Sequence, residues 1–153
     1  MSELPFILFG QQHFFALVLS ALTIIYFPLY AKKKLSKDSQ EAIAKTLAIF
    51  LIVHELSRPF YRPYFFGDEL ILSFPLHACH LSAFSIAVYL LVRKKVFFEV
   101  AYYWGLGGGT MALLTPDITR AFPDIEWFPF FMGHVAMIMA IFFSMFCHNT
   151  YPS

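Results

Sequence analysis

The chain has 153 residues, of which 59% are hydrophobic, 20% aromatic and only 14% charged, with a net charge of +1. Its mean hydropathy is +0.64, whereas a soluble domain is nearer half apolar and about a quarter charged. This composition predicts a membrane protein. The small net charge, without a basic stripe, argues against a nucleic-acid partner.

Five apolar runs follow one another along the chain, and each approaches or exceeds the roughly 20 residues that a helix needs to cross a bilayer. They cover residues 13–30, 42–60, 70–92, 96–115 and 127–147. Each is expected to be helical, because unpaired backbone groups are too costly in lipid. No Lys or Arg precedes the first run, so it is expected to be a retained span and not a cleaved signal. The sequence therefore predicts an all-α fold, a polytopic bundle of five transmembrane helices in a single transmembrane domain, residues 1–153.

Basic residues are unevenly divided among the gaps between these runs. The gaps after the first and third runs hold eight of the eleven, namely Lys32, Lys33, Lys34, Lys37, Lys45, Arg93, Lys94 and Lys95. The other three, Arg58, Arg62 and Arg120, lie in the gaps after the second and fourth runs. Lys and Arg concentrate on the cytoplasmic side of membrane proteins. The N-terminus is therefore predicted outside the cell and the C-terminus inside.

Polar side chains within the runs fall at one depth, near the predicted outer boundary. They are His54, Glu55 and Arg58 in the second run, His77, Cys79 and His80 in the third, Asp117 at the end of the fourth, His134 in the fifth, and Gln11, Gln12 and His13 at the start of the first. Such groups are expensive in hydrocarbon, so they are expected to face the bundle interior. A functional cavity in the outer half is the favoured interpretation, and a hydrogen-bonded network that only holds the helices together is the alternative.

Two chemistries are compatible with this layer. His77 and His80 are three residues apart and could bind zinc or iron with His54, Glu55 and His134, but the sequence lacks an HExxH motif. We therefore expect no metal and no cofactor.

Cys79 offers the second chemistry, although a buried cysteine is commonly a small inert hydrophobe. Flanking histidines could draw its proton and generate a nucleophilic thiolate, with Asp117 or Glu55 orienting the base. Cys147, at the predicted cytoplasmic end, is expected to be structural. The two cysteines differ in depth by roughly 15 Å, so a disulfide between them is not expected.

Two further features have structural interpretations. The glycines at 105, 107, 108 and 109 do not follow a strand, so they predict close helix packing and not a phosphate loop. Glu99 is expected to pair with Lys95, one helical turn earlier. The segments 58–69 and 116–126 mix aromatic residues with proline and charge, and they are expected to form surface helices or lids.

Three segments resemble the YwaF-like family of bacterial integral membrane proteins. They are FPLHACHLSAF, YYWGLGGGTMALLTPDI with the following FPD, and FPFFMGH, which together span about residues 74–134. That family is similar to vertebrate multipass acyltransferases that remodel ether phospholipids with a membrane cysteine and a later histidine. The resemblance implies a bacterial plasma-membrane location, an acyl-thioester on Cys79 and His134 as its general base. Family members usually continue with a further helical pair, whereas this chain ends at CHNTYPS.

The favoured function is acyl transfer or hydrolysis on a membrane lipid. Cys79 is the predicted nucleophile, His134 the base and His80 a further catalytic group. The expected substrate-binding or orienting residues are His77, His54, Glu55, Arg58 and Asp117. A transporter or ligand-binding membrane protein with a buried His/Glu/Asp network is the alternative, and a purely structural subunit is a third possibility.

Overall fold

The computed structural model describes residues 4–153, and within them the chain is helical with a single isolated β-bridge between Pro5 and Arg120. The helices are α1 Gln11–Lys34, α2 Lys37–Phe66, α3 Leu70–Ser73, α4 Ala78–Val92, α5 Lys95–Val100, the π-helical segment η1 Ala101–Gly105, α6 Leu106–Leu114 and α7 Trp127–Cys147. The expected all-helical fold class is confirmed for the described residues.

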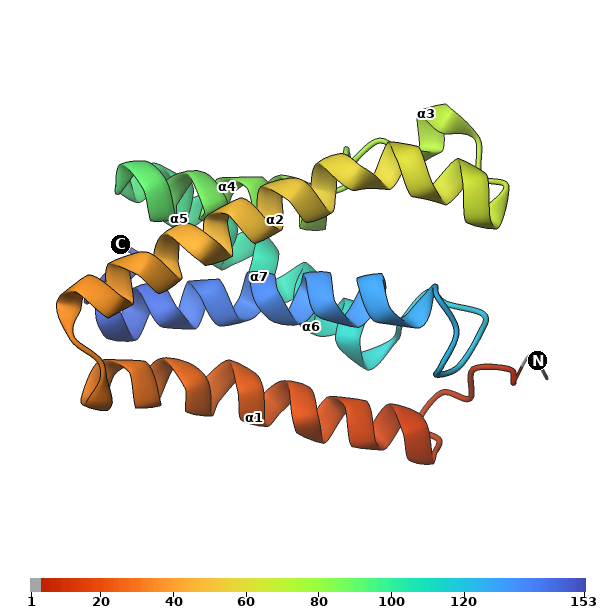
Figure 1. The fold of residues 1–153 in the computed structure, drawn as a ribbon, viewed down its shortest axis with the longest axis horizontal. Helices are drawn as coiled ribbons and strands as arrows, with labels where there is room; N and C mark the ends of the chain where they lie inside the picture. The colour runs from red at the N-terminus through yellow and green to blue at the C-terminus, as the bar shows by residue number, and fades with distance from the viewer. Residues whose placement is uncertain (1–3) are drawn as a thin grey trace.

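Helix α7 lies at the centre of the bundle. It packs against α1 on one side and against α2 and α4 on the other, as Figure 1 shows, and it also contacts α6. Small buried residues let these helices approach closely, among them Ala44 and Ala48 of α2, Ala83 and Ala87 of α4, and Ala140 of α7. The predicted glycine packing is also confirmed, because a β-carbon at Gly105 or Gly109 would press against side chains of α7.

Two helices, α1 with 24 residues and α7 with 21, are long and apolar enough to cross a membrane. The α4 helix is apolar but has only 15 residues. The segments α5, η1 and α6 follow one another without a gap and form one helix whose middle segment is π-helical. Large apolar side chains also cover the outside of α1, where Phe14, Phe15, Leu22 and Tyr26 are each more than half exposed. A soluble monomer rarely leaves so much apolar surface in water. These features support a membrane protein, and the five-span arrangement stays a prediction.

The ends of α2 explain why this helix is longer than the predicted run. Ser36 caps its start by accepting a hydrogen bond from the Ser39 amide at 3.2 Å. Its end comes only at Phe66, where Gly67 takes a left-handed conformation with φ of 71°. The expected outer segment 58–69 is thus mostly a continuation of α2, which carries Arg62 beyond the predicted span.

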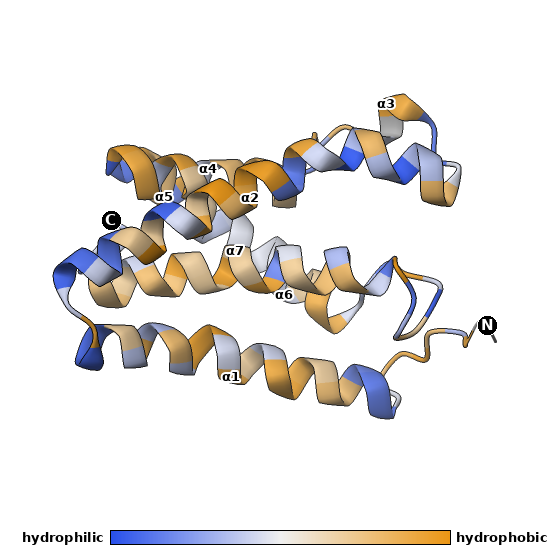
Figure 2. Ribbon diagram, viewed as in Figure 1, coloured by the Kyte–Doolittle hydropathy of each residue, from blue (hydrophilic) through white to orange (hydrophobic). Residues whose placement is uncertain are grey.

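The two basic gaps lie at the same end of the bundle. Lys37, at the start of α2, donates a hydrogen bond to the carbonyl of Cys147 at the end of α7, with a distance of 3.2 Å. Arg93, which follows α4, contacts Glu41 at 2.6 Å. Figure 2 shows hydrophilic residues gathered at this end and again at the far end of α2. The N-terminal segment lies at the opposite end, where the Phe6 amide donates to the carbonyl of Thr119 at 3.0 Å.

Candidate functional site

The α4 helix begins in the middle of the third apolar run, and this break creates the site. The ring of a proline disfavours helical backbone angles at the residue before it. Phe74, which precedes Pro75, is accordingly extended, with ψ of 139°. His77 is also extended and is the N-cap of α4. The predicted single helix over residues 70–92 is therefore interrupted, and Cys79 lies in the first turn of a new helix.

A cavity of about 370 Å³ lies at this break, between α2, the start of α4 and the start of α7. Its walls are Arg58, Tyr61, Arg62, Phe66, His77, Cys79, His80, Asp117, Ile118, Glu126, Pro129, Phe130 and His134. A smaller cavity of about 20 Å³ adjoins it and adds His54 and Glu55. All eight of the predicted site residues thus line one of the two cavities; their catalytic and binding roles stay predictions.

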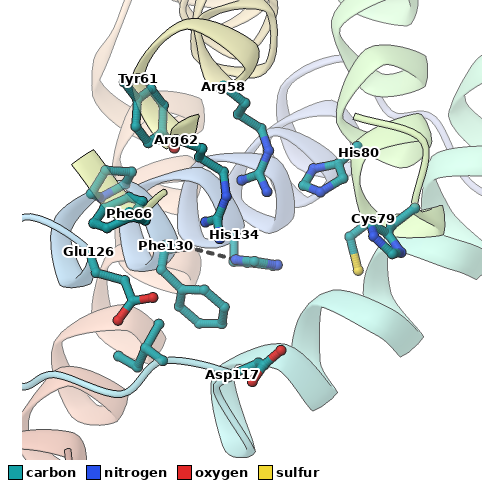
Figure 3. A pocket seen from close by; sticks show the side chains of 13 residues that line it. Arg58, Tyr61, Arg62, Phe66, Cys79, His80, Asp117, Glu126, Phe130 and His134 are labelled. Carbon is teal, nitrogen blue, oxygen red and sulfur yellow. Dashed lines mark hydrogen bonds between the residues drawn. The ribbon is translucent and has the colours of Figure 1, made fainter. Parts of the chain in front are cut away.

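His134 has a defined orientation in the cavity. Its Nδ1 lies 2.8 Å from the carbonyl oxygen of Phe130, one turn earlier on α7. A carbonyl can only accept, so Nδ1 carries the proton and donates it. The remaining nitrogen, Nε2, is then the one that can accept a proton in neutral His134. Figure 3 shows this ring directed into the space between Arg58, Cys79 and Asp117.

Cys79 lines the same cavity and lies against α6. A β-carbon at Gly108 would be 3.0 Å from its Sγ, which is tighter than ordinary van der Waals contact. Within residues 4–153 no hydrogen bond joins the Cys79 thiol to His134. The Cys79 thiol and the His134 ring therefore line one cavity without a hydrogen bond between them. Catalytic hydrogen bonds often form or shorten only when the substrate binds.

Glu55 is almost fully buried, at 4% exposure, and lies between two histidines. Its Oε1 is 3.2 Å from Nδ1 of His54, and its Oε2 is 2.7 Å from Nδ1 of His80. His54 also contacts the carbonyl of Pro129 on α7 through Nε2, at 3.0 Å. Glu55 thus contacts His80, one of the histidines that flank Cys79, as expected of a residue that orients an imidazole. His134 is held instead by the Phe130 carbonyl.

Arg58 and Arg62 both reach the cavity from α2, but only one is paired. The guanidinium of Arg62 is held by Asp68, with Nε to Oδ2 at 2.6 Å. Arg58 has a buried Nε without a hydrogen-bond partner, and no ion pair of its side chain occurs in the described part of the chain. An unpaired guanidinium beside a cavity is suited to bind an anionic group.

The first helix does not contribute to this site, which corrects the expectation that all five runs converge. His13 is fully buried and structural. It accepts from the Phe9 amide through Nδ1 at 3.0 Å and donates through Nε2 to the carbonyl of Leu113 at 2.8 Å. Gln11 and Gln12 line a separate cavity beside the N-terminal segment.

Sequence reasoning also missed several walls of the cavity. Tyr61, Phe66, Glu126 and Phe130 were not singled out, because aromatic residues and a loop carboxylate carry no spacing signal. Among residues 4–153 there is no group of three or more His, Cys, Asp or Glu side chains arranged to hold a metal ion. The cysteines are both free, as expected, and Lys95 pairs with Glu99 at 3.6 Å.

Comparison with known proteins then places the chain. The profile of the TMEM164 family matches residues 8–153. The chain belongs to the TMEM164 family. It is also similar to an uncharacterized protein of Treponema pallidum (strain Nichols), with 29% identity over 148 residues. That match covers 92% of this chain and 58% of the relative, so the chain spans a little over half of the relative's length. No solved structure matches, and neither match carries a YwaF-like or acyltransferase name.

Proposed function

We propose that this member of the TMEM164 family is an integral membrane enzyme that transfers or hydrolyses an acyl group of a membrane lipid. Cys79 is the nucleophile and His134 is its general base. The observation that carries this proposal is the orientation of His134. Its Nδ1 donates to the Phe130 carbonyl, so Nε2 is the basic nitrogen in a cavity that also contains a thiol.

The position of Cys79 supports the same role. A partly buried thiol needs a base in order to ionise, because burial disfavours the charged form. The first turn of a helix presents backbone N–H groups without intrahelical partners, and these favour a thiolate and a developing oxyanion. Cys79 is the second residue of α4. Arg58, Asp117 and His77 line the remaining walls and can orient the substrate.

A lipid substrate fits the surroundings of the site. The outer faces of α1 and α2 carry exposed apolar side chains, including Phe60 at 81% exposure, and an acyl chain can enter laterally from a bilayer. We further propose that the chain crosses a bacterial plasma membrane five times with its N-terminus outside, which places the cavity in the outer half. The excess of Lys and Arg at the opposite end, eight of the eleven basic residues, supports this orientation.

Intact-protein mass spectrometry after incubation with phospholipid vesicles tests the proposal. We expect a mass increase of one acyl group on the wild type and on Cys147→Ala, and none on Cys79→Ala. Release of the adduct by neutral hydroxylamine identifies a thioester. Wild-type protein that stays unmodified while its cavity cysteine remains reactive toward alkylating reagents contradicts the proposal.

A transporter or ligand-binding role is the second candidate, and the buried histidine–carboxylate pairs favour it. Transporters use such chains to bind and release protons. In that case Cys79→Ser should retain function, whereas an acyl-transfer enzyme should lose it. The same replacement therefore separates the two candidates.

A further inference from the structure

His80 lines the cavity together with His77 and His134, and its environment differs from that of His134. Its Nδ1 lies 2.7 Å from a carboxylate oxygen of Glu55. The contact is that of an ion pair when the ring is protonated, and it leaves Nε2 of His80 as the nitrogen for proton exchange with a substrate. The residue is 8% exposed and lines both cavities beside Cys79.

The partner of each histidine decides what the ring can do during a reaction. A carbonyl, such as that of Phe130, fixes the tautomer of His134 without a full negative charge. The carboxylate of Glu55 also stabilises the positive charge that forms when the ring of His80 gains a second proton. Two titratable groups in different environments are the arrangement by which enzymes divide acid and base roles.

His54 keeps the carboxylate in place. Both of its ring nitrogens face acceptors, Oε1 of Glu55 at 3.2 Å and the Pro129 carbonyl at 3.0 Å. Gly133 leaves the space for this ring, since a β-carbon there would overlap it. The unit therefore connects α2, α4 and α7.

We propose that His80 is the general acid–base of the leaving and accepting alcohols, with Glu55 and His54 as its positioning residues, while His134 serves the Cys79 thiol. The inference rests on the proposed acyl chemistry. His134 then exchanges protons with the Cys79 thiol, and His80 exchanges protons with the alcohol oxygens of the substrates.

The proton transfers balance over two steps. First, the thiol proton passes to Nε2 of His134, and the thiolate attacks the ester carbonyl. The carbon–oxygen bond breaks, and the leaving alkoxide takes the Nε2 proton of His80, which begins the reaction as an imidazolium beside the Glu55 carboxylate. A neutral His80 and an acyl-thioester on Cys79 remain. Then an acceptor alcohol or water gives a proton to Nε2 of His80 and attacks the thioester. The carbon–sulfur bond breaks, and the thiolate of Cys79 regains its proton from His134.

Two esters with different leaving groups test this division. A p-nitrophenoxide leaves without protonation, whereas the alkoxide of a glycerol ester needs a proton. The purified protein is acylated with p-nitrophenyl decanoate or with phosphatidylcholine vesicles, and the rate of adduct formation on Cys79 is measured. General acid–base groups typically contribute about 10²–10⁴-fold to a rate. We therefore expect His80→Gln to slow the acylation of Cys79 by phosphatidylcholine about 100-fold or more, and its acylation by the nitrophenyl ester less than about fivefold.

The other variants sharpen the result. His134→Gln should slow both esters, because both need the thiolate. Glu55→Gln should repeat the leaving-group dependence of His80→Gln in weaker form, which a general loss of folding cannot do. His148→Gln, at the opposite end of the bundle, is the matched control and should change neither rate by more than about twofold.

Three outcomes overturn the inference. If His80→Gln slows both esters equally, the residue is structural or serves the thiol. If it slows neither, it has no proton-transfer role. If wild-type Cys79 accepts an acyl group from neither ester, the proposed function itself fails, and the assignment of His80 fails with it.

Discussion

The space around the Cys79 thiol depends on the absence of a β-carbon at Gly108. The thiol occupies space that a β-carbon on α6 would fill, at 3.0 Å from Sγ. The adjacent Gly107 has nothing within 4 Å of the corresponding position. The two glycines thus have different roles, which their sequence context GLGGGT does not reveal.

Replacement of these glycines should separate packing from helix propensity. Gly108→Ala should displace the Cys79 thiol and slow its alkylation by a membrane-permeant maleimide at least threefold. Gly107→Ala should leave that rate near the wild-type value, and it should stabilise α6 by up to about 1 kcal/mol, since alanine favours a helix over glycine. Equal rates for the two variants would show that Gly108 does not confine the thiol.

The pairing of Cys79 with His134 makes its own prediction at this scale. His134→Ala should slow the reaction of Cys79 with a hydrophobic electrophile tenfold or more, about 1.4 kcal/mol in barrier. Cys147 provides the reference, because it is 3% exposed and its thiol faces the Pro28 carbonyl at 3.7 Å. It should react slowly and at the same rate in both proteins. An unchanged rate for Cys79 would separate the two residues chemically and favour the transporter.

At the level of elements, the break before α4 does most to form the cavity, and the sequence did contain its signal. Pro75 lies inside the third apolar run, yet hydropathy alone joined residues 70–92 into one span. By contrast, α7 coincides with the predicted run at 127–147, because no proline or charge interrupts its interior after the first turn. The backbone restriction that Pro75 imposes thus locates the start of α4, which a hydropathy average over about 20 residues does not reveal.

The ends of three elements meet in a charged cluster at the basic end of the bundle. Arg93 donates to Nδ1 of His148 at 3.0 Å and to Glu41 at 2.6 Å. An imidazole nitrogen that accepts from arginine carries no proton, so His148 is neutral in this arrangement. Burial, together with the charge of Arg93, lowers the pKa of His148 from 6.5 to about 4. The contact between Arg93 and Nδ1 of His148 therefore requires a neutral His148, while Nε2 of His148 lies 3.3 Å from a carboxylate oxygen of Glu41.

Acidification should weaken this cluster. A histidine with a lowered pKa contributes stability above its ordinary value of 6.5, and that contribution is lost as the pH falls toward about 4. Glu41 acts in the same direction: burial raises its pKa, but Arg93 lowers it further, so its net pKa lies below 4.5. The thermal midpoint in detergent should fall between pH 6.5 and 4, and His148→Gln should flatten the upper part of that fall. A midpoint that is independent of pH in both proteins would contradict the assignment.

For the whole molecule, composition and the depth of polar residues predicted more than any motif. They gave the helical class and brought the residues of the second, third and fifth runs to one cavity. They failed for His13, Gln11 and Gln12, because depth places a residue along an axis and does not say which neighbour it faces. The partners of Glu55 could likewise not be predicted from the sequence, since they depend on the rotation of α2 about its axis relative to α4 and α7.

The segregation of charge leads to a prediction about topology. The Lys-rich turn before α2 and the loop that precedes α7 lie at opposite ends of the bundle (Figure 1), and the excess of basic residues predicts that the first of them is cytoplasmic. In a background with Cys79 and Cys147 replaced by alanine, Asp38→Cys should react with an impermeant maleimide only after the cells are permeabilised. Ile125→Cys, at an exposed position of the outer loop, should react in intact cells. The reverse pattern would invert the protein and open the cavity of Cys79 to the cytoplasm, where the acyl donor and acceptor would have to be sought in the inner leaflet.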